Sequence, residues 1–134
     1  MMIRRQFLDG RKRLRTQLAL LLIGMAAFVA APSAFFHFEL LRSTPANNAE
    51  LTKAPVRLQL WFSQKPAAGV SHLTLTTDQK DIALRKTVIV ARDKSMYAEP
   101  LAPLVPGRYT IHWRGAGDDG HVQTGRITFS VAAK

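Results

Sequence analysis

From residue 37 onward, apolar and polar side chains alternate with a period of two in several short segments. A period of two places every second side chain on one face of a β-strand, whereas a helix needs an apolar period of about 3.6. No segment keeps the helical period. We therefore predict five strands, over residues 56–62, 72–76, 87–90, 109–114 and 127–131. The first of these has Val56, Leu58, Leu60 and Phe62 on one face.

Turn-forming residues separate the five segments. Proline, glycine, asparagine or aspartate occur at 45–48, 65–69, 77–80, 100–107 and 115–117. Short strands at this spacing, with turns between them, are typical of a β-sandwich or small barrel. Within such a fold, Tyr109 and Trp113 are expected in the core, because aromatic side chains contribute much of the buried apolar surface. Trp61 alternates away from Phe62 and is expected to be partly exposed.

Residues 1–36 differ from the rest of the chain and predict an export signal. They carry six basic residues and one acidic residue, followed by an apolar run over 18–34 that ends in small side chains. This order is typical of a signal peptide. Residues 4–8 (Arg-Arg-Gln-Phe-Leu) resemble the twin-arginine pattern, with Sec export as the alternative. An uncleaved membrane anchor is a further alternative, since about 17 residues is the short limit for a spanning helix.

Charge and cysteine content exclude several classes of function. The formal net charge is +10, of which half belongs to residues 1–36. The thirteen basic and eight acidic residues of 37–134 are scattered and are not interleaved with aromatic residues, so nucleic-acid binding is not expected. The chain has no cysteine, which removes disulfides, thiolate metal sites and thiol nucleophiles. No catalytic triad, carboxylate pair or phosphate-binding loop is recognisable, so the protein is not expected to be an enzyme.

Four stretches resemble, in the same order, those of the CopC-like periplasmic copper-binding proteins. The patterns are H-x-x-L-x-x-S-x-P-A at 37–46, L-x-L-x-F-S at 58–63, L-x-P-G-x-Y-x-V-x-W within 101–114, with isoleucine at the valine position, and D-G-H-x-x-x-G-x-x-x-F at 119–129. The resemblance spans residues 37–132. It implies that residues 37–134 form an all-β, immunoglobulin-like Greek-key sandwich or barrel of about seven strands. It also implies a periplasmic copper carrier that often works with a CopD-like inner-membrane copper transporter.

The same resemblance implies a Cu(II) site formed by an N-terminal histidine and by the aspartate and histidine of the D-x-H motif. Here these residues are His37, Asp119 and His121. Cu(II) prefers a tetragonal set of nitrogen and oxygen donors, which these side chains can supply. Residues two apart on a strand project to one face, so Asp119 and His121 are expected to lie together. Gly120 between them permits an irregular backbone.

The N-terminal histidine is one position where the chain departs from the family pattern. A mature chain that began at His37 would place Phe36 directly before the cleavage point, where a signal peptidase prefers a small residue. Cleavage after residue 33 or 34 would leave the imidazole of His37 but remove its free amine. The amine matters because it would close a chelate with the ring of the same residue.

The remaining departures concern the other donors. Gln64 stands where the family has glutamate, and a neutral amide is a poorer Cu(II) ligand, so Gln64 is expected to be at most a neighbour of the site. Met96 is the only methionine after residue 36, so a methionine-rich Cu(I) site is not expected. His72 and His112 lie opposite the apolar positions of their strands and are expected to be solvated rather than metal ligands.

The sequence therefore predicts a periplasmic Cu(II) carrier or chaperone in copper homeostasis and resistance. Two other functions remain open. One is a β-sandwich interaction module that binds no metal and is tethered at the membrane by its N-terminal segment. The other is an oxidative copper enzyme in which His37 and His121 hold the metal.

Overall fold

The computed structural model describes residues 37–78 and 80–133, so the predicted export signal of residues 1–36 lies outside the described residues. The described chain forms nine strands and one short 3-10 helix. No helix in these two ranges is long and apolar enough to cross a membrane. The elements in chain order are β1 (Leu40–Thr44), β2 (Ala49–Leu51), β3 (Leu58–Phe62), β4 (His72–Thr77), β5 (Lys80–Ile82), β6 (Val88–Val90), η1 (Ala91–Asp93), β7 (Ser95–Ala98), β8 (Gly107–Ala116) and β9 (Val122–Val131).

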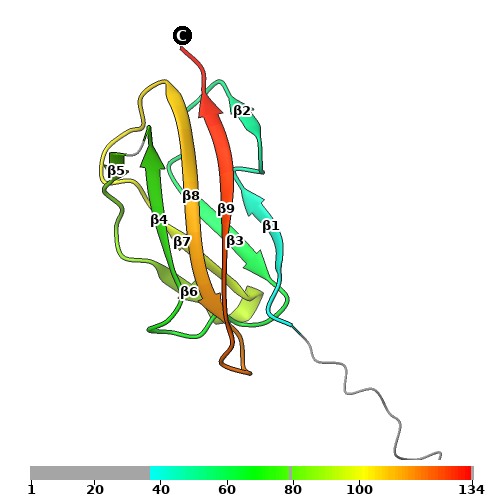
Figure 1. The fold of residues 1–134 in the computed structure, drawn as a ribbon. Helices are drawn as coiled ribbons and strands as arrows, with labels where there is room; N and C mark the ends of the chain where they lie inside the picture. Colours follow the sequence, from blue (N-terminus) through cyan, green and yellow to red (C-terminus); the bar gives the residue numbers. More distant parts are fainter. Residues whose placement is uncertain (1–36, 79, 134) are drawn as a thin grey trace, which may run out of the picture. The chain divides into compact units, whose positions relative to one another are not determined.

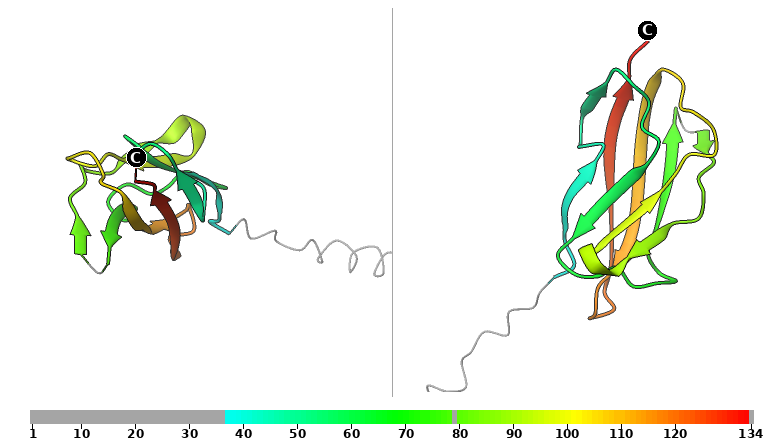
Figure 2. Two further views of the ribbon diagram at one scale, coloured as in Figure 1. Left: turned by 90° about the horizontal axis from the view of Figure 1, so that it is seen from above. Right: turned by 180° about the vertical axis from the view of Figure 1, so that it is seen from behind.

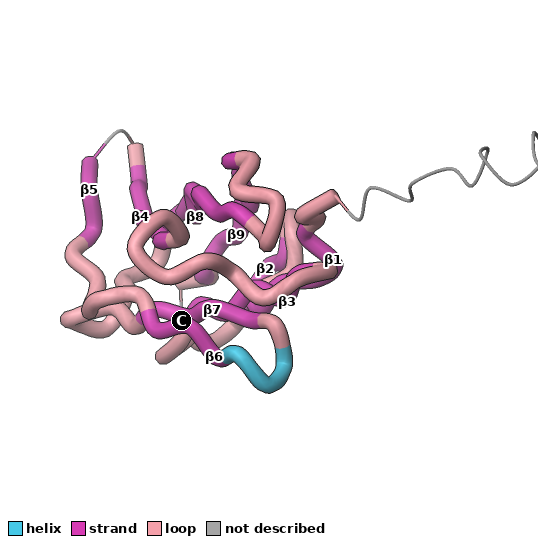
Figure 3. Tube along the Cα trace, turned by 90° about the horizontal axis from the view of Figure 1, so that it is seen from below, coloured by secondary structure: helices cyan, strands magenta, loops and turns pink. Residues whose placement is uncertain are grey.

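The strands form two sheets that pack face to face, as the predicted sandwich requires (Figures 1 and 2). One sheet has the order β1-β3-β7-β6, and the other has the order β2-β9-β8-β4-β5. All pairs are antiparallel except β2 with β9. Successive strands repeatedly change sheet, which gives the Greek-key arrangement. In Figure 3, η1 follows β6 at the margin of the four-stranded sheet.

Alternate side chains of the long strands meet between the two sheets and form the core. Tyr109, Trp113 and Phe62 are buried there, as predicted. Tyr109 stacks on Phe129 with ring centroids 5.4 Å apart. Trp61 is half-buried on the opposite face, with the guanidinium of Arg42 3.6 Å from its ring centroid. The period of two therefore identified the buried face of β3 and β8 correctly.

Two details of the predicted strands were wrong. Val56 lies outside β3 and is 84% exposed. It has no strand to pair with, because β1 ends at Thr44 and β7 ends at Ala98, which pairs with Leu58. In the 87–90 segment, Val88 and Val90 alternate with Thr87 and Ile89, which predicts a valine face toward the core, but in β6 Ile89 packs against the core and Val88 is 41% exposed. An apolar residue in a short edge strand can face either side, so alternation alone does not identify its buried face.

The buried hydroxyl of Tyr109 joins β8 to the loop before it, and its removal should destabilise the domain. The hydroxyl donates a hydrogen bond of 2.7 Å to the carbonyl of Val105. We expect Tyr109→Phe to lower the free energy of unfolding by about 1 kcal/mol, because the carbonyl loses its donor. Urea unfolding measures the change. Tyr97→Phe is the control, since no hydrogen bond joins that hydroxyl to the described residues, and an equal loss in both variants would contradict the prediction.

Candidate metal centre

The first described residues are fixed to the end of β3. The hydroxyl of Ser63 donates to the carbonyl of His37 at 2.7 Å and accepts from the backbone N–H of Glu39 at 2.9 Å. The backbone N–H of Ser63 donates to the carbonyl of Glu39, also at 2.9 Å. Between them, Phe38 is buried and stacks on Phe62 with ring centroids 4.5 Å apart. The core thus holds the backbone of His37 at this end of the sandwich, while its side chain stays exposed.

A third segment, the turn between β8 and β9, is joined to the same place through Gln64. The side-chain oxygen of Gln64 accepts a hydrogen bond of 2.9 Å from the backbone N–H of Asp118. Gly117 permits this approach, because a Cβ atom at that position would overlap the amide of Gln64. Residues 37–39, 63–64 and 117–121 therefore meet at one end of the domain, at the lower end in Figure 1.

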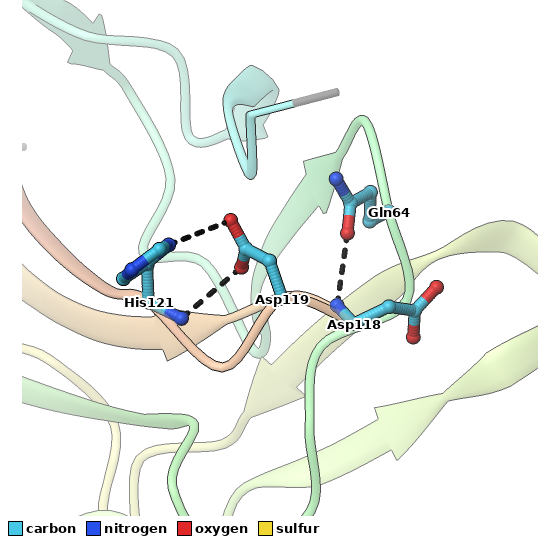
Figure 4. Close-up of polar contacts among 4 residues, drawn as sticks. All are labelled: Gln64, Asp118, Asp119 and His121. Carbon is cyan, nitrogen blue, oxygen red and sulfur yellow. Dashed lines mark hydrogen bonds and ion pairs between the residues drawn. The ribbon is translucent and has the colours of Figure 1, made fainter. Parts of the chain in front are cut away.

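Asp119 and His121 are brought together by a turn. The N–H of Gly120 donates to the carbonyl of Gly117 at 3.2 Å, and Gly120 has a φ of 72°, which favours glycine. One carboxylate oxygen of Asp119 accepts from the backbone N–H of His121 at 3.1 Å, and the other lies 3.1 Å from Nδ1 of its ring (Figure 4). The expected proximity is confirmed, but the reason was wrong: both residues lie between β8 and β9, not on a strand.

The pair is accessible to solvent, and its charges interact. The side chain of His121 is 83% exposed and that of Asp119 is 35% exposed. The pKa of the Asp119 carboxyl is lowered from its ordinary value of 3.8. The hydrogen bond from the His121 side chain has the largest effect, followed by the one from its backbone N–H; the charges of His121 and His37 add smaller effects, and partial burial opposes them. His37 therefore lies close enough to Asp119 for their charges to interact.

The lowered pKa of Asp119 can be tested directly in the metal-free protein. In a carboxyl NMR titration, Asp119 should lose its charge below pH 3.8, and His121→Ala should move its midpoint upward. A lowered carboxyl pKa favours the folded pair above the ordinary pKa, and this advantage is lost as the pH falls through the lowered value. Asp118 is the control, because its carboxylate points away from the pair in Figure 4. An unchanged Asp119 midpoint in His121→Ala would contradict the assignment.

The donors at this end fit an oxidised copper ion. Because Nδ1 of His121 faces the Asp119 carboxylate, Nε2 points away from that carboxylate, so one metal ion can bind both side chains only after the imidazole turns. Asp119 adds oxygen donors, and His37 adds a further imidazole. Within 37–78 and 80–133, no three histidine or acidic side chains are already gathered closely enough to hold a metal ion. Completion of the site thus requires a rotation of exposed side chains, which their backbone anchors permit.

The other candidate residues take structural positions. Gln64 anchors the turn instead of pointing an amide into the pair, as Figure 4 shows. His72 and His112 lie on β4 and β8, on the outer face of the five-stranded sheet, and not in the turn that holds Asp119 and His121. Ser63, which ties down the segment before β1, was not singled out from the sequence. Its only signal was its place in the L-x-L-x-F-S pattern, which does not reveal a hydrogen bond to a residue 26 positions away.

The model of the CopC domain family matches residues 40–132. This chain belongs to the CopC family. Copper resistance protein C of Xanthomonas campestris pv. juglandis is similar to it, with 33% identity over 121 residues that cover 85% of this chain and 94% of that protein. Protein YobA of Escherichia coli strain K12 is 32% identical over 124 residues, which cover 90% of this chain and 95% of YobA.

The fold also agrees with a solved member of the CopC family. The crystal structure of PcoC, a methionine-rich copper resistance protein from Escherichia coli, has a TM-score of 0.65 to this chain at 33% identity. The similar region covers 71% of this chain and 98% of PcoC. In contrast to that methionine-rich relative, the described part of this CopC-family chain has a single methionine, Met96, which is 0% exposed in the core. The described residues therefore hold no surface thioether donor.

Proposed function

We propose that this protein is a periplasmic carrier or chaperone that binds Cu(II) through His37, Asp119 and His121, and that it catalyses no reaction. The observation that carries the proposal is the Asp119–His121 pair, held beside the fixed segment of His37 at an exposed end. An exposed site suits a carrier, because a partner protein can approach the metal directly. The copper resistance relatives supply the choice of metal.

The donor types support Cu(II) over Cu(I). Imidazole nitrogen and carboxylate oxygen suit the tetragonal geometry of Cu(II), whereas Cu(I) favours thioether and thiolate sulfur. Met96 is buried and the chain has no cysteine. Copper bound here would be cargo that enters and leaves from solvent. Under this proposal, export by residues 1–36 places the domain in the periplasm, where a CopD-like inner-membrane transporter is the expected recipient.

A copper titration at two pH values tests the proposal. Residues 37–134 can be produced as a domain, because the solved PcoC chain, 98% of which is covered, consists of this fold alone. We expect one equivalent of Cu(II) per domain near pH 7, with a tetragonal electron paramagnetic resonance spectrum and nitrogen hyperfine structure. Affinity should be lower at the more acidic of the two pH values, because a protonated imidazole cannot bind metal. Asp119 remains ionised in this range, since its pKa is lowered.

The outcomes separate this function from its two rivals. A domain that binds no Cu(II) above the level of His37→Ala/His121→Ala would be an interaction module without metal. Copper-dependent turnover of peroxide or of a reducing substrate, lost in the same double variant, would indicate an oxidative enzyme instead. Stoichiometric Cu(II) with no turnover above that of free copper is the expected result.

A further inference from the structure

The outer face of the five-stranded sheet carries a hollow that the proposed copper site does not use. It has a volume of about 460 Å³ and is lined by residues of β4, β8 and β9. These three strands lie toward the viewer in Figure 1. Its floor is formed by Trp113 and Gly125, which are paired across β8 and β9. Polar or charged side chains of the three strands make its walls: His72, Thr74, His112, Arg114, Thr124 and Arg126.

This hollow is positively charged and has no carboxylate in its lining. Arg114 and Arg126 are both exposed, and neither forms an ion pair with any residue in the described ranges. The carboxylate of Asp81 lines a neighbouring hollow, together with the cationic side chains of Arg85 and Lys86. The surface is thus complementary to negative charge.

The walls of the hollow are fixed by hydrogen bonds. Nδ1 of His72 lies 3.2 Å from the carbonyl of Val70, and Nε2 of His112 lies 3.1 Å from the hydroxyl of Thr76. Because hydrogen bonds hold the two histidines in place, the two arginines are the side chains that can extend toward a ligand. An arginine guanidinium can bind a carboxylate with two parallel hydrogen bonds.

The spacing of the arginines matches an extended acidic segment. Arg114 pairs with Thr124, and Arg126 lies two residues further along β9, so the arginines are diagonal neighbours. Diagonal neighbours on adjacent strands lie about 7–8 Å apart. In an extended peptide, side chains on the same face repeat at about 7 Å. Two acidic residues separated by one position can therefore reach both arginines at once.

We propose that this hollow docks an extended acidic segment of the protein that exchanges copper with this domain. The proposal rests on the proposed copper-carrier function. β8 and β9 run from the hollow directly into the turn that holds Asp119 and His121, so a partner docked there lies beside the metal. A lipid surface is a poorer match, because lipid-binding basic clusters use about four to eight cationic residues, and the hollow has two arginines.

A capped peptide of alternating glutamate and threonine is the probe. Titrated into the isotope-labelled domain, it should shift the backbone amides of β4, β8 and β9 around the hollow. Arg114→Gln/Arg126→Gln should weaken binding about tenfold or more, because two charge-assisted contacts are lost. Lys53→Gln/Arg92→Gln removes the same charge from exposed positions elsewhere and should leave the affinity unchanged.

Several results would overturn the docking proposal. These are an absence of amide shifts around the hollow, equal weakening by both double variants, or equally tight binding of a control peptide in which glutamine replaces every glutamate. Inorganic phosphate or phosphatidylglycerol vesicles that bind as tightly as the peptide would show a general anion site or a membrane surface instead. Copper binding is measured separately, and Arg114→Gln/Arg126→Gln should bind copper as tightly as the wild-type domain. A wild-type domain that binds no copper would refute the carrier function. The peptide titration would still show whether the hollow binds an acidic segment.

Discussion

His121→Ala should weaken Cu(II) binding by more than about a hundredfold. The loss of a partner that only orients a ligand already costs about 10–100-fold in metal affinity, and His121 is expected to bind the metal directly. Its removal also frees the Asp119 carboxylate, which the histidine ring and its backbone N–H now hold in place. One substitution thus removes a nitrogen donor and loosens an oxygen donor.

The experiment is a competition between the domain and a chelator of known Cu(II) affinity, near neutral pH. His72→Ala is the matched control, because His72 is also an exposed histidine, but it lies on the outer face of β4. The fold should survive in both variants, since the His121 side chain is 83% exposed. Equal copper affinities in the two variants would remove His121 from the site and leave the carrier proposal without its main support.

Much of the fold followed from the alternation of side chains, and the exceptions have a common cause. The buried faces of β3, β4, β8 and β9 were predictable, because one face of each strand is covered by the opposite sheet. The three-residue strands β2, β5 and β6 are too short for a period to be visible. β1 has no fully buried side chain, and only Leu40 packs against the core, so its pairing with β3 leaves no alternating apolar pattern in the sequence.

The proximity of Asp119 and His121 was predictable from their spacing, but the turn geometry that produces it was not. A strand and a turn closed by Gly120 both bring together two side chains that are two positions apart, so the spacing does not distinguish between them. The role of Gln64 could not be predicted from the sequence, for a different reason. Its hydrogen bond joins positions 54 residues apart, and only the packing of the two sheets brings them together. Long-range contacts of single polar side chains leave no local pattern.

A domain that begins at His37 should bind Cu(II) at least about a hundredfold more tightly than one that begins at Ala34. When His37 is the first residue, its free amine and its imidazole can both bind the metal, so a single residue supplies two nitrogens of a tetragonal set. Three residues added in front of His37 convert that amine into an amide. The expected loss of affinity again exceeds the cost of removing a residue that only orients a metal ligand, which is about 10–100-fold.

The segment around His37 is positioned to exploit such a terminus. Ser63 and the buried ring of Phe38 hold its backbone beside the Asp119–His121 turn, so the amine would need little reorganisation. Fusion proteins cut to leave either His37 or Ala34 first provide the two domains, and His37→Ala in the longer one isolates the imidazole. A chain beginning at Phe35 is unsuitable, because a histidine in third position forms a four-nitrogen chelate with its own amides and amine. If the domains that begin at His37 and at Ala34 bind Cu(II) with equal affinity, the terminal amine is not a ligand, and the site consists of side chains alone.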